Sequence, residues 1–426
     1  MKDQILLWNP NSQNDGPGVF MISGGHEMCT SRFARLVVLA IVGFFLFIFS
    51  NTSLFSSNPA IGAAQPGLTV HEWGTFTSVS GTDGQSLYWR PLIVESDLPR
   101  FVYSVDQGNS WRGLRYQQKS GTPVRVRMET PVIFFYTDQP LQVSVNVNFN
   151  EGKITEWFPR ATQVSGGMIR WDQFQAIPGL HTNLPHEGRE SHYYPARETD
   201  AAVLQVDGNT AKAEHEKFLF YRGVGDFNLP IVVQVSGQKL SIKDSQGSKV
   251  GKVIVFENRR GQIGYEIHQL GDDELIANRP AVGSQLDGLR RELKSMLVAE
   301  GLFEKEADTM LRTWDDSWFE PGLRVFYILP RESTDKILPL TISPEPQKLE
   351  RVLVGRAEII TPEMERDLTT QIVRLTDRSA SVRRTARSEI FKYGRFLEPL
   401  LAQVKRHTVH ETVRLEIDRL FNEMPR

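Results

Sequence analysis

The feature that most constrains this chain is a run of fourteen apolar residues, LVVLAIVGFFLFIF, at positions 36–49. Two basic residues, Arg32 and Arg35, lie just before the run, and small residues at 62–64 offer a cleavage site ahead of Gln65. This order is typical of a secretory signal peptide, whereas a membrane span needs roughly 17–25 residues. The sequence therefore predicts that the bulk of the chain is exported to the periplasm or the cell exterior.

The long stretch between Phe49 and Gln65 leaves a second interpretation open, in which residues 36–55 stay uncleaved and anchor the protein in the inner membrane. In both cases the basic flank stays in the cytoplasm. Cys29, the only cysteine, lies on that side. The exported part then contains no cysteine, so it can form neither an intrachain disulfide nor a thiolate metal cluster.

The charge balance is nearly neutral, with 49 Lys and Arg against 51 Asp and Glu, and 40% of the residues are hydrophobic. This composition is that of a globular protein and argues against intrinsic disorder. It also gives no support for a nucleic-acid partner, which usually requires a basic excess. We divide the chain into a leader (1–64), an exported β domain (65–361) and a tail (362–426).

The β domain is predicted from short strands separated by turns. Residues 141–150 alternate between apolar and polar side chains, which is typical of a half-buried strand. Four further strand patterns between 231 and 267 are separated by glycine-containing turns and indicate an antiparallel meander. The predicted fold class is mainly β, an antiparallel β-sandwich. A helical insertion at 284–314, with leucines at helical spacing, is expected to pack on the sheet.

The tail differs in character, because residues 362–426 contain no tryptophan and show four amphipathic helical patterns. The part of the tail from Leu375 to Met424 resembles a pair of HEAT-like repeat halves. Such repeats stack helices and need neighbours. The resemblance implies that the tail docks on its own domain or on a protein partner.

The first candidate site is HEWGTFT at 71–77. On a strand, neighbouring side chains point to opposite faces, so His71 and Glu72 are expected on different sides of the sheet. A polar and aromatic face suits a polar ligand such as a carbohydrate. The alternative is an ordinary first strand whose histidine bonds a threonine. The candidate ligand-binding residues are His71, Trp73, Thr75, Trp157, Tyr193, Tyr194 and Arg222.

Four motifs resemble those of a group of exported bacterial proteins with no established activity. They are HEWGTFTS at 71–78, RMETP at 127–131, TEWFP at 155–159 and KFLFYR at 217–222. The resemblance covers roughly residues 68–360 and implies one continuous domain. It brings no catalytic residues.

A second candidate site is a histidine-rich loop. Three of the nine histidines, His181, His186 and His192, fall within twelve residues. Together with His71 they are a candidate set of ligands for a divalent metal such as zinc. The spacings match no strong metal template, so a solvated loop is the alternative, and no cofactor is certain.

The third candidate set consists of the carboxylates Glu72, Glu129 and Glu156. Glycoside hydrolysis needs two carboxylates about 5–10 Å apart, on either side of the bond that breaks. Arginines are plentiful enough to pair with all three glutamates, which is the alternative. The leading functional hypothesis is an exported ligand-binding or scaffolding protein with an interaction tail. The competing hypothesis is an extracytoplasmic hydrolase, glycosidase-like or metal-assisted, and whether the protein is an enzyme stays open.

Overall fold

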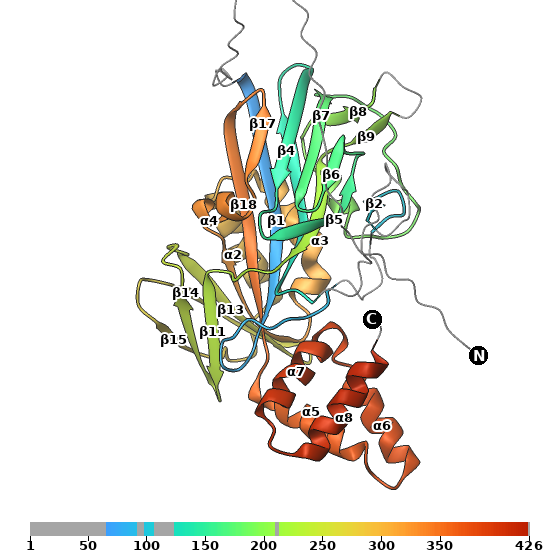
Figure 1. Ribbon diagram of the computed structural model, residues 1–426. Coiled ribbons are helices and arrows are strands. Elements are labelled where there is room, and N and C mark those ends of the chain that lie inside the picture. Colours follow the sequence, from blue (N-terminus) through green and yellow to red (C-terminus); the bar gives the residue numbers. More distant parts are fainter. Residues whose placement is uncertain (1–64, 92–97, 106–122, 209–212, 425–426) are drawn as a thin grey trace, which may run out of the picture. The chain divides into compact units, whose positions relative to one another are not determined.

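The protein is mainly β, as its sequence predicts, in a computed structural model that describes residues 65–91, 98–105, 123–208 and 213–424. Its largest sheet crosses the middle of the β domain (Figure 1). The strands of this sheet follow the order β14 (Gln262–Gln269), β13 (Lys252–Arg259), β16 (Gly322–Ile328), β18 (Pro346–Ile359), β1 (Gln65–Ser80), β3 (Val126–Tyr136), β10 (Leu219–Gly225), β5 (Gly152–Phe158) and β2 (Tyr103–Ser104).

Two smaller sheets accompany the large one. The first consists of β11 (Ile231–Ser236), β12 (Lys239–Asp244) and β15 (Leu275–Asn278). The second consists of β17 (Leu340–Ser343), β4 (Leu141–Asn148), β7 (Met168–Ile177), β8 (Val203–Val206), β9 (Glu214–Glu216) and β6 (Gln163–Ser165). The strand predicted at 141–150 is β4, and its buried and less buried residues alternate as the sequence indicates.

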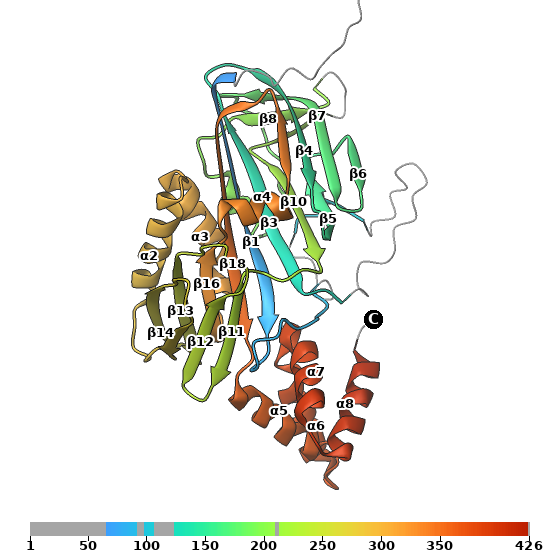
Figure 2. The ribbon, with the colours of Figure 1, turned by 60° about the vertical axis from the view of Figure 1, so that its left-hand side comes forward.

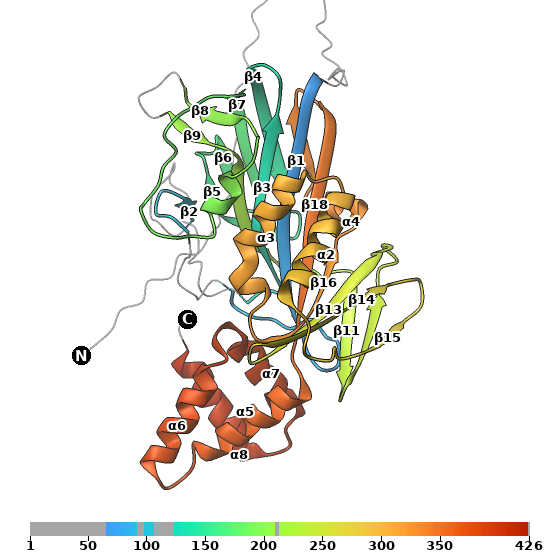
Figure 3. The same ribbon diagram turned by 180° about the vertical axis from the view of Figure 1, so that it is seen from behind.

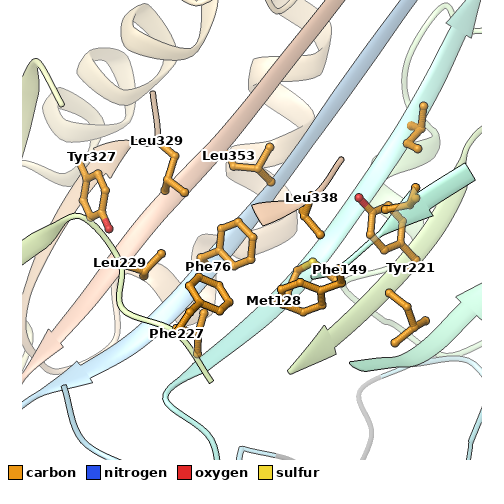
Figure 4. Packing of buried hydrophobic residues seen from close by; sticks show 14 of the residues in the cluster. Phe76, Met128, Phe149, Tyr221, Phe227, Leu229, Tyr327, Leu329, Leu338 and Leu353 are labelled. Atoms are coloured by element: carbon orange, nitrogen blue, oxygen red, sulfur yellow. The ribbon is translucent and has the colours of Figure 1, made fainter. Parts of the chain in front are cut away.

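One hydrophobic cluster joins the three sheets. Phe76 of β1, Met128 of β3 and Leu353 of β18 face apolar side chains of the smaller sheets and the loops between them (Figure 4). Valines of β4 and β11 belong to the same cluster. The period of two in each strand explains this arrangement, because alternate side chains of the large sheet point into this layer.

The opposite face of the large sheet is covered by helices. α2 (Leu286–Ala299) and α3 (Glu304–Trp318) lie on this face (Figure 3). Their leucines, methionines and tryptophans pack against Trp73, Phe134 and Phe326. The predicted insertion at 284–314 therefore exists as two helices on the sheet, and its second helix runs four residues further, to Trp318. A short helix, α4 (Arg331–Ile337), and the 3-10 turn η2 (Tyr194–Arg197) complete the domain.

The prediction of an antiparallel fold needs two corrections. β1 and β18 run parallel in the centre of the large sheet, from the pair Thr69–Lys348 to the pair Ser80–Ile359. The strands predicted as one meander also separate, because β12 pairs with β15 while β13 and β14 join the large sheet. Hydrophobic alternation reports which face of a strand is buried. It carries no information about the partner or direction of the strand.

The tail consists of α5 (Pro362–Arg374), α6 (Ala380–Phe391), the 3-10 turn η3 (Gly394–Phe396), α7 (Leu397–His407) and α8 (Glu411–Glu423), which correspond to the four predicted helical patterns (Figure 2). Their apolar faces form a cluster that also takes in Val79, Trp89 and Ile360 of the β domain. Arg90 binds Glu398 across this boundary at 2.8 Å. Residues Gly62–Arg426 accordingly form one compact unit.

Among the described residues, no helix is long and apolar enough to cross a membrane. The predicted signal or anchor segment at 36–55 and Cys29 lie outside the described residues.

Candidate functional site

Glu72 and His71 lie on opposite sides of β1, as the strand pattern predicts, and each is bound within the protein. Glu72 is fully buried in the layer between the sheets. Its carboxylate accepts hydrogen bonds from Tyr221 Oη and from Arg351 Nε, the latter at 2.5 Å. Arg351 also reaches Asp335 of α4 at 2.7 Å. This arrangement gives Glu72 the role of a buried ion-pair partner.

His71 attaches the helical layer to the sheet. Its Nδ1 lies 2.6 Å from a carboxylate oxygen of Glu306 in α3, and both side chains are fully buried. The rings of Tyr136 and Phe303 pack beside the imidazole, with centroids 5.4 and 4.5 Å away. Burial and the charge of Glu306 raise the pKa of Tyr136, so its phenol stays protonated.

The structure does not bring the four candidate metal ligands together. His186 stacks on Tyr194 at a centroid distance of 4.2 Å, and His192 Nδ1 lies 2.6 Å from the carbonyl oxygen of Thr313. These two histidines line one cavity and His181 lines another, while His71 is bound to α3. Within the described part of the chain, no three His, Cys, Asp or Glu residues are grouped to hold a metal ion. The histidines of this loop therefore lie in separate surroundings and not around one ion.

Most of the predicted carbohydrate-binding side chains are inside the protein. Trp73, Thr75 and Tyr193 are each at most 1% exposed and cannot present a surface to a sugar ring. Trp157 is half-buried and stacks on Tyr103 with centroids 6.1 Å apart. These aromatic residues serve the core, where large apolar side chains contribute most to packing.

The carboxylates Glu129 and Glu156 lie in the large sheet on β3 and β5, the two strands that flank β10. Thr77 Oγ1 donates a hydrogen bond of 2.8 Å to Glu129, and Arg127 Nε lies 3.3 Å from the same carboxylate. Burial would raise the pKa of Glu129, but the charges of Arg127 and Arg395 outweigh burial and hold this pKa below its ordinary value. Glu129 is therefore ionised at neutral pH.

Glu156 has a similar environment. It accepts a hydrogen bond from Thr155 Oγ1 and stands opposite Arg222 in the pairing of β5 with β10. Glu156 and Arg222 are both at most 3% exposed. The RMETP, TEWFP and KFLFYR motifs thus meet across the adjacent strands β3, β10 and β5, with Glu156 and Arg222 at paired positions of the sheet.

Further charges on β16, β18 and η3, and in the turn that follows α3, extend this set. Glu358 is buried between Arg324, whose Nε lies 3.0 Å away, and Arg356. Glu320 accepts hydrogen bonds from Arg356 at 2.8 Å and from Arg395 of the tail. We call these five residues the buried ion network. Because Arg395 belongs to η3, the network ties the tail to the large sheet.

Arg395 and Glu320 also line a cleft of about 940 Å³ between the ends of β13 and β16 and the tail helices. We call it the tail cleft. Its apolar wall comes from both sides, and consists of Leu323, Met364, Phe391, Phe396, Leu397 and Met424. Phe391 is 40% exposed, which is high for a phenylalanine and leaves its ring available to a ligand.

Six cationic side chains surround this wall: Arg90, Arg259, Arg260, Arg279, Lys392 and Arg395. Four acidic residues share the lining, namely Glu257, Glu320, Glu363 and Glu398, so the cleft has an excess of positive charge. Burial would raise the pKa of Glu257, but hydrogen bonds from Arg259 and Arg279 outweigh burial and keep it below its ordinary value. Glu257 thus holds Arg259 and Arg279 in fixed positions.

Sequence reasoning missed the tail cleft. Its wall is assembled from residues near 90, 257–260, 279, 320–323, 361–364 and 391–398, and each stretch by itself reads as an ordinary turn or helix end. Comparisons of the chain with protein-family models and with curated proteins give no match.

Proposed function

We propose that this chain is an exported ligand-binding protein of the bacterial envelope and that the tail cleft is its binding site. The observation that carries the proposal is the combination, in one cleft, of an apolar wall with a basic rim. Most small-molecule sites are concave and largely apolar, with a few placed polar groups, and occupy about 300–1,000 Å³. The tail cleft matches that description in size and chemistry.

We also propose a more specific fold and location for the chain. We take the packed sheets as a β-sandwich, the tail as a HEAT-like repeat pair, and residues 36–49 as the export segment. In this proposal the tail has two roles, since its η3 and helix ends form one wall of the cleft while its outer surface remains available to a protein partner.

The site is held in place before any ligand binds. Arg395 of the tail binds Glu320, which also binds Arg356 in the centre of the sheet. On the other side of the cleft, Arg279 of the β domain binds Glu363 of α5 at 2.9 Å. A preorganised site loses less conformational freedom on binding, which favours affinity.

The hydrolase hypothesis has less geometric support. Glu72 lies on the opposite side of the sheet from Thr77 and its partner Glu129, so these two carboxylates cannot flank one bond. Glu129 is also held ionised, which removes it as a general acid. The carbohydrate hypothesis is weakened because its aromatic residues are largely buried.

The test is a titration of the purified protein with 1-anilinonaphthalene-8-sulfonate, an apolar dye that carries one negative charge. We expect saturable binding that weakens about fivefold in Phe391→Ala, since losing contact with part of one ring costs about 1 kcal/mol. Leu415→Ala is the matched control, because Leu415 is 53% exposed and lies outside the cleft wall. Equal affinity for the dye in wild type and Phe391→Ala would refute the assignment of the site.

A further inference from the structure

Arg260 differs from the other cations of the tail cleft in having no acidic partner. Arg90 binds Glu398, and Arg259 and Arg279 both bind Glu257. Lys392 binds Glu389 and Arg395 binds Glu320. Across the described residues, Arg260 has neither an ion-pair partner nor a side-chain hydrogen bond. Its guanidinium, exposed at the cleft, is the one in that wall whose charge the protein leaves unmatched.

The backbone at Arg260 is also unusual. Arg259 pairs with Gln262, so Arg260 and Gly261 form the two-residue turn between β13 and β14. Their φ angles are 57° and 91°, which is the left-handed region that a type I′ turn requires. Asparagine, aspartate and glycine favour this conformation, whereas a long side chain such as arginine pays a steric cost. Arginine at this position does not favour folding, so its presence in the turn suggests a functional role.

We propose that Arg260 binds the oxyanion of an amphipathic ligand whose apolar body lies against Phe391 and Met364. The inference rests on the proposed function and deepens it by naming the ligand class, an apolar chain or ring system that ends in a carboxylate or a phosphate monoester. Guanidinium groups bind both oxyanions through paired hydrogen bonds. Because Arg260 has no competing acid, its full charge is available to the ligand.

The test compares four twelve-carbon probes by isothermal titration calorimetry with the full-length protein, below their micelle concentrations: dodecanoate, dodecyl phosphate, dodecanol and dodecyltrimethylammonium. We expect the two anions to bind at least tenfold more tightly than the neutral and cationic probes. Raising the salt concentration from 50 to 500 mM is expected to weaken only the anions, because salt screens exposed charges. The ratio of the two anion affinities distinguishes a carboxylate ligand from a phosphate ligand.

Two variants separate a binding role from a structural one. Arg260→Asn creates an Asn-Gly turn, the preferred type I′ sequence, so its thermal midpoint is expected to equal or exceed that of the wild type. Its affinity for the preferred anion is expected to fall about tenfold, while its affinity for dodecanol stays unchanged. Arg291→Gln, which removes an exposed charge on α2 outside the cleft, is the control and leaves every affinity unchanged.

The outcomes also separate this inference from the proposed function. Equal binding of anionic and neutral probes, or an unchanged anion affinity in Arg260→Asn, overturns the role of Arg260. If Phe391→Ala still weakens the dye in that case, the tail cleft remains the binding site. If none of the probes binds, the ligand class is wrong.

Discussion

Glu358 offers the sharpest test of the buried ion network, because a single substitution removes one charge and almost nothing else. The carboxylate lies between Arg324 and Arg356, whose side chains are both fully buried. Glu358 Oε1 accepts hydrogen bonds from Nε of both arginines, and Arg324 Nε also lies 3.2 Å from Oε2. In Glu358→Gln an amide oxygen can replace Oε1, but the NH₂ group would then face the Arg324 donor. In the part of the chain that the structure describes, the remaining ion-pair partner of both guanidinium groups is Glu320, which is 31% exposed and lies 2.8 Å from Arg356 but 3.9 Å from Arg324.

Breaking a buried ion pair by removing one partner costs about 3–5 kcal/mol, because the remaining charge is left in a medium of low polarity. We expect the free energy of unfolding of Glu358→Gln to fall by this amount at pH 7, measured by urea denaturation with tryptophan fluorescence. The control, Glu292→Gln, removes an exposed carboxylate from α2 and should change stability by less than about 0.5 kcal/mol.

The pH dependence checks the cause. Burial would raise the pKa of Glu358, but the charges of Arg324 and Arg356 outweigh burial and hold this pKa below the ordinary value of 4.5. The ion pair therefore stabilises the fold fully above about pH 4.5, and this stabilisation is lost as the pH falls through the depressed pKa. The difference between wild type and Glu358→Gln should be constant from pH 7 to 5 and shrink below that range. A difference under about 1 kcal/mol at pH 7, or one that acidification leaves unchanged, would refute the reasoning.

Three further outcomes follow from the packing. Gly355→Ala should lower stability by about 1–3 kcal/mol in a thermal melt, because a Cβ there would lie 2.1 Å from the buried ring of Tyr327. Gly271→Ala is the control, since Gly271 has open space around it. Equal melting temperatures of the two variants would contradict the prediction. Tyr221→Phe removes a hydrogen bond to the buried carboxylate of Glu72. The free energy of unfolding, measured by urea denaturation, should fall by about 1.5–3 kcal/mol. A change near zero would show that this hydrogen bond does not stabilise the fold. Deletion of 362–426 uncovers the cluster that the tail shares with the β domain, so the thermal midpoint of the remaining β domain should fall. An unchanged midpoint would show that the tail contributes no essential cover.

The sequence correctly predicts which side of a strand or helix each side chain faces, but it does not predict which strands pair with one another. The alternation at 71–77 correctly separates His71 from Glu72, because a strand has a period of two whatever its neighbours are. The amphipathic patterns of the tail predict α5 to α8 for the same local reason. The parallel partner of β1 lies more than 260 residues away along the chain, and no local pattern reports that distance. The short helix α4 was missed because its sequence, RESTDKI, is almost entirely polar.

The candidate site shows the same division. Residue types made Glu72 and Glu129 reasonable catalytic candidates, but their roles depend on groups that the fold supplies. Arg351 reaches Glu72 across a separation of 279 residues, and Arg395 of the tail lowers the pKa of Glu129. Arg260 could have been noticed from Arg-Gly in a two-residue hairpin turn, where Asn-Gly is expected. The position of Arg260 in a cleft could not have been predicted from the sequence.

The parallel pairing of β1 with β18 also has a consequence for the order of folding. β1, the first strand of the domain, pairs with β18, which ends at Ile359. The centre of the large sheet therefore cannot form until most of the chain has been synthesised. β3 can pair with β1 earlier, and this leaves one edge of β1 open in the meantime. Contacts between distant parts of a chain form slowly, and open strand edges invite aggregation. Until β18 has been made, the edge of β1 that β18 covers in the folded protein is open to pairing with other chains.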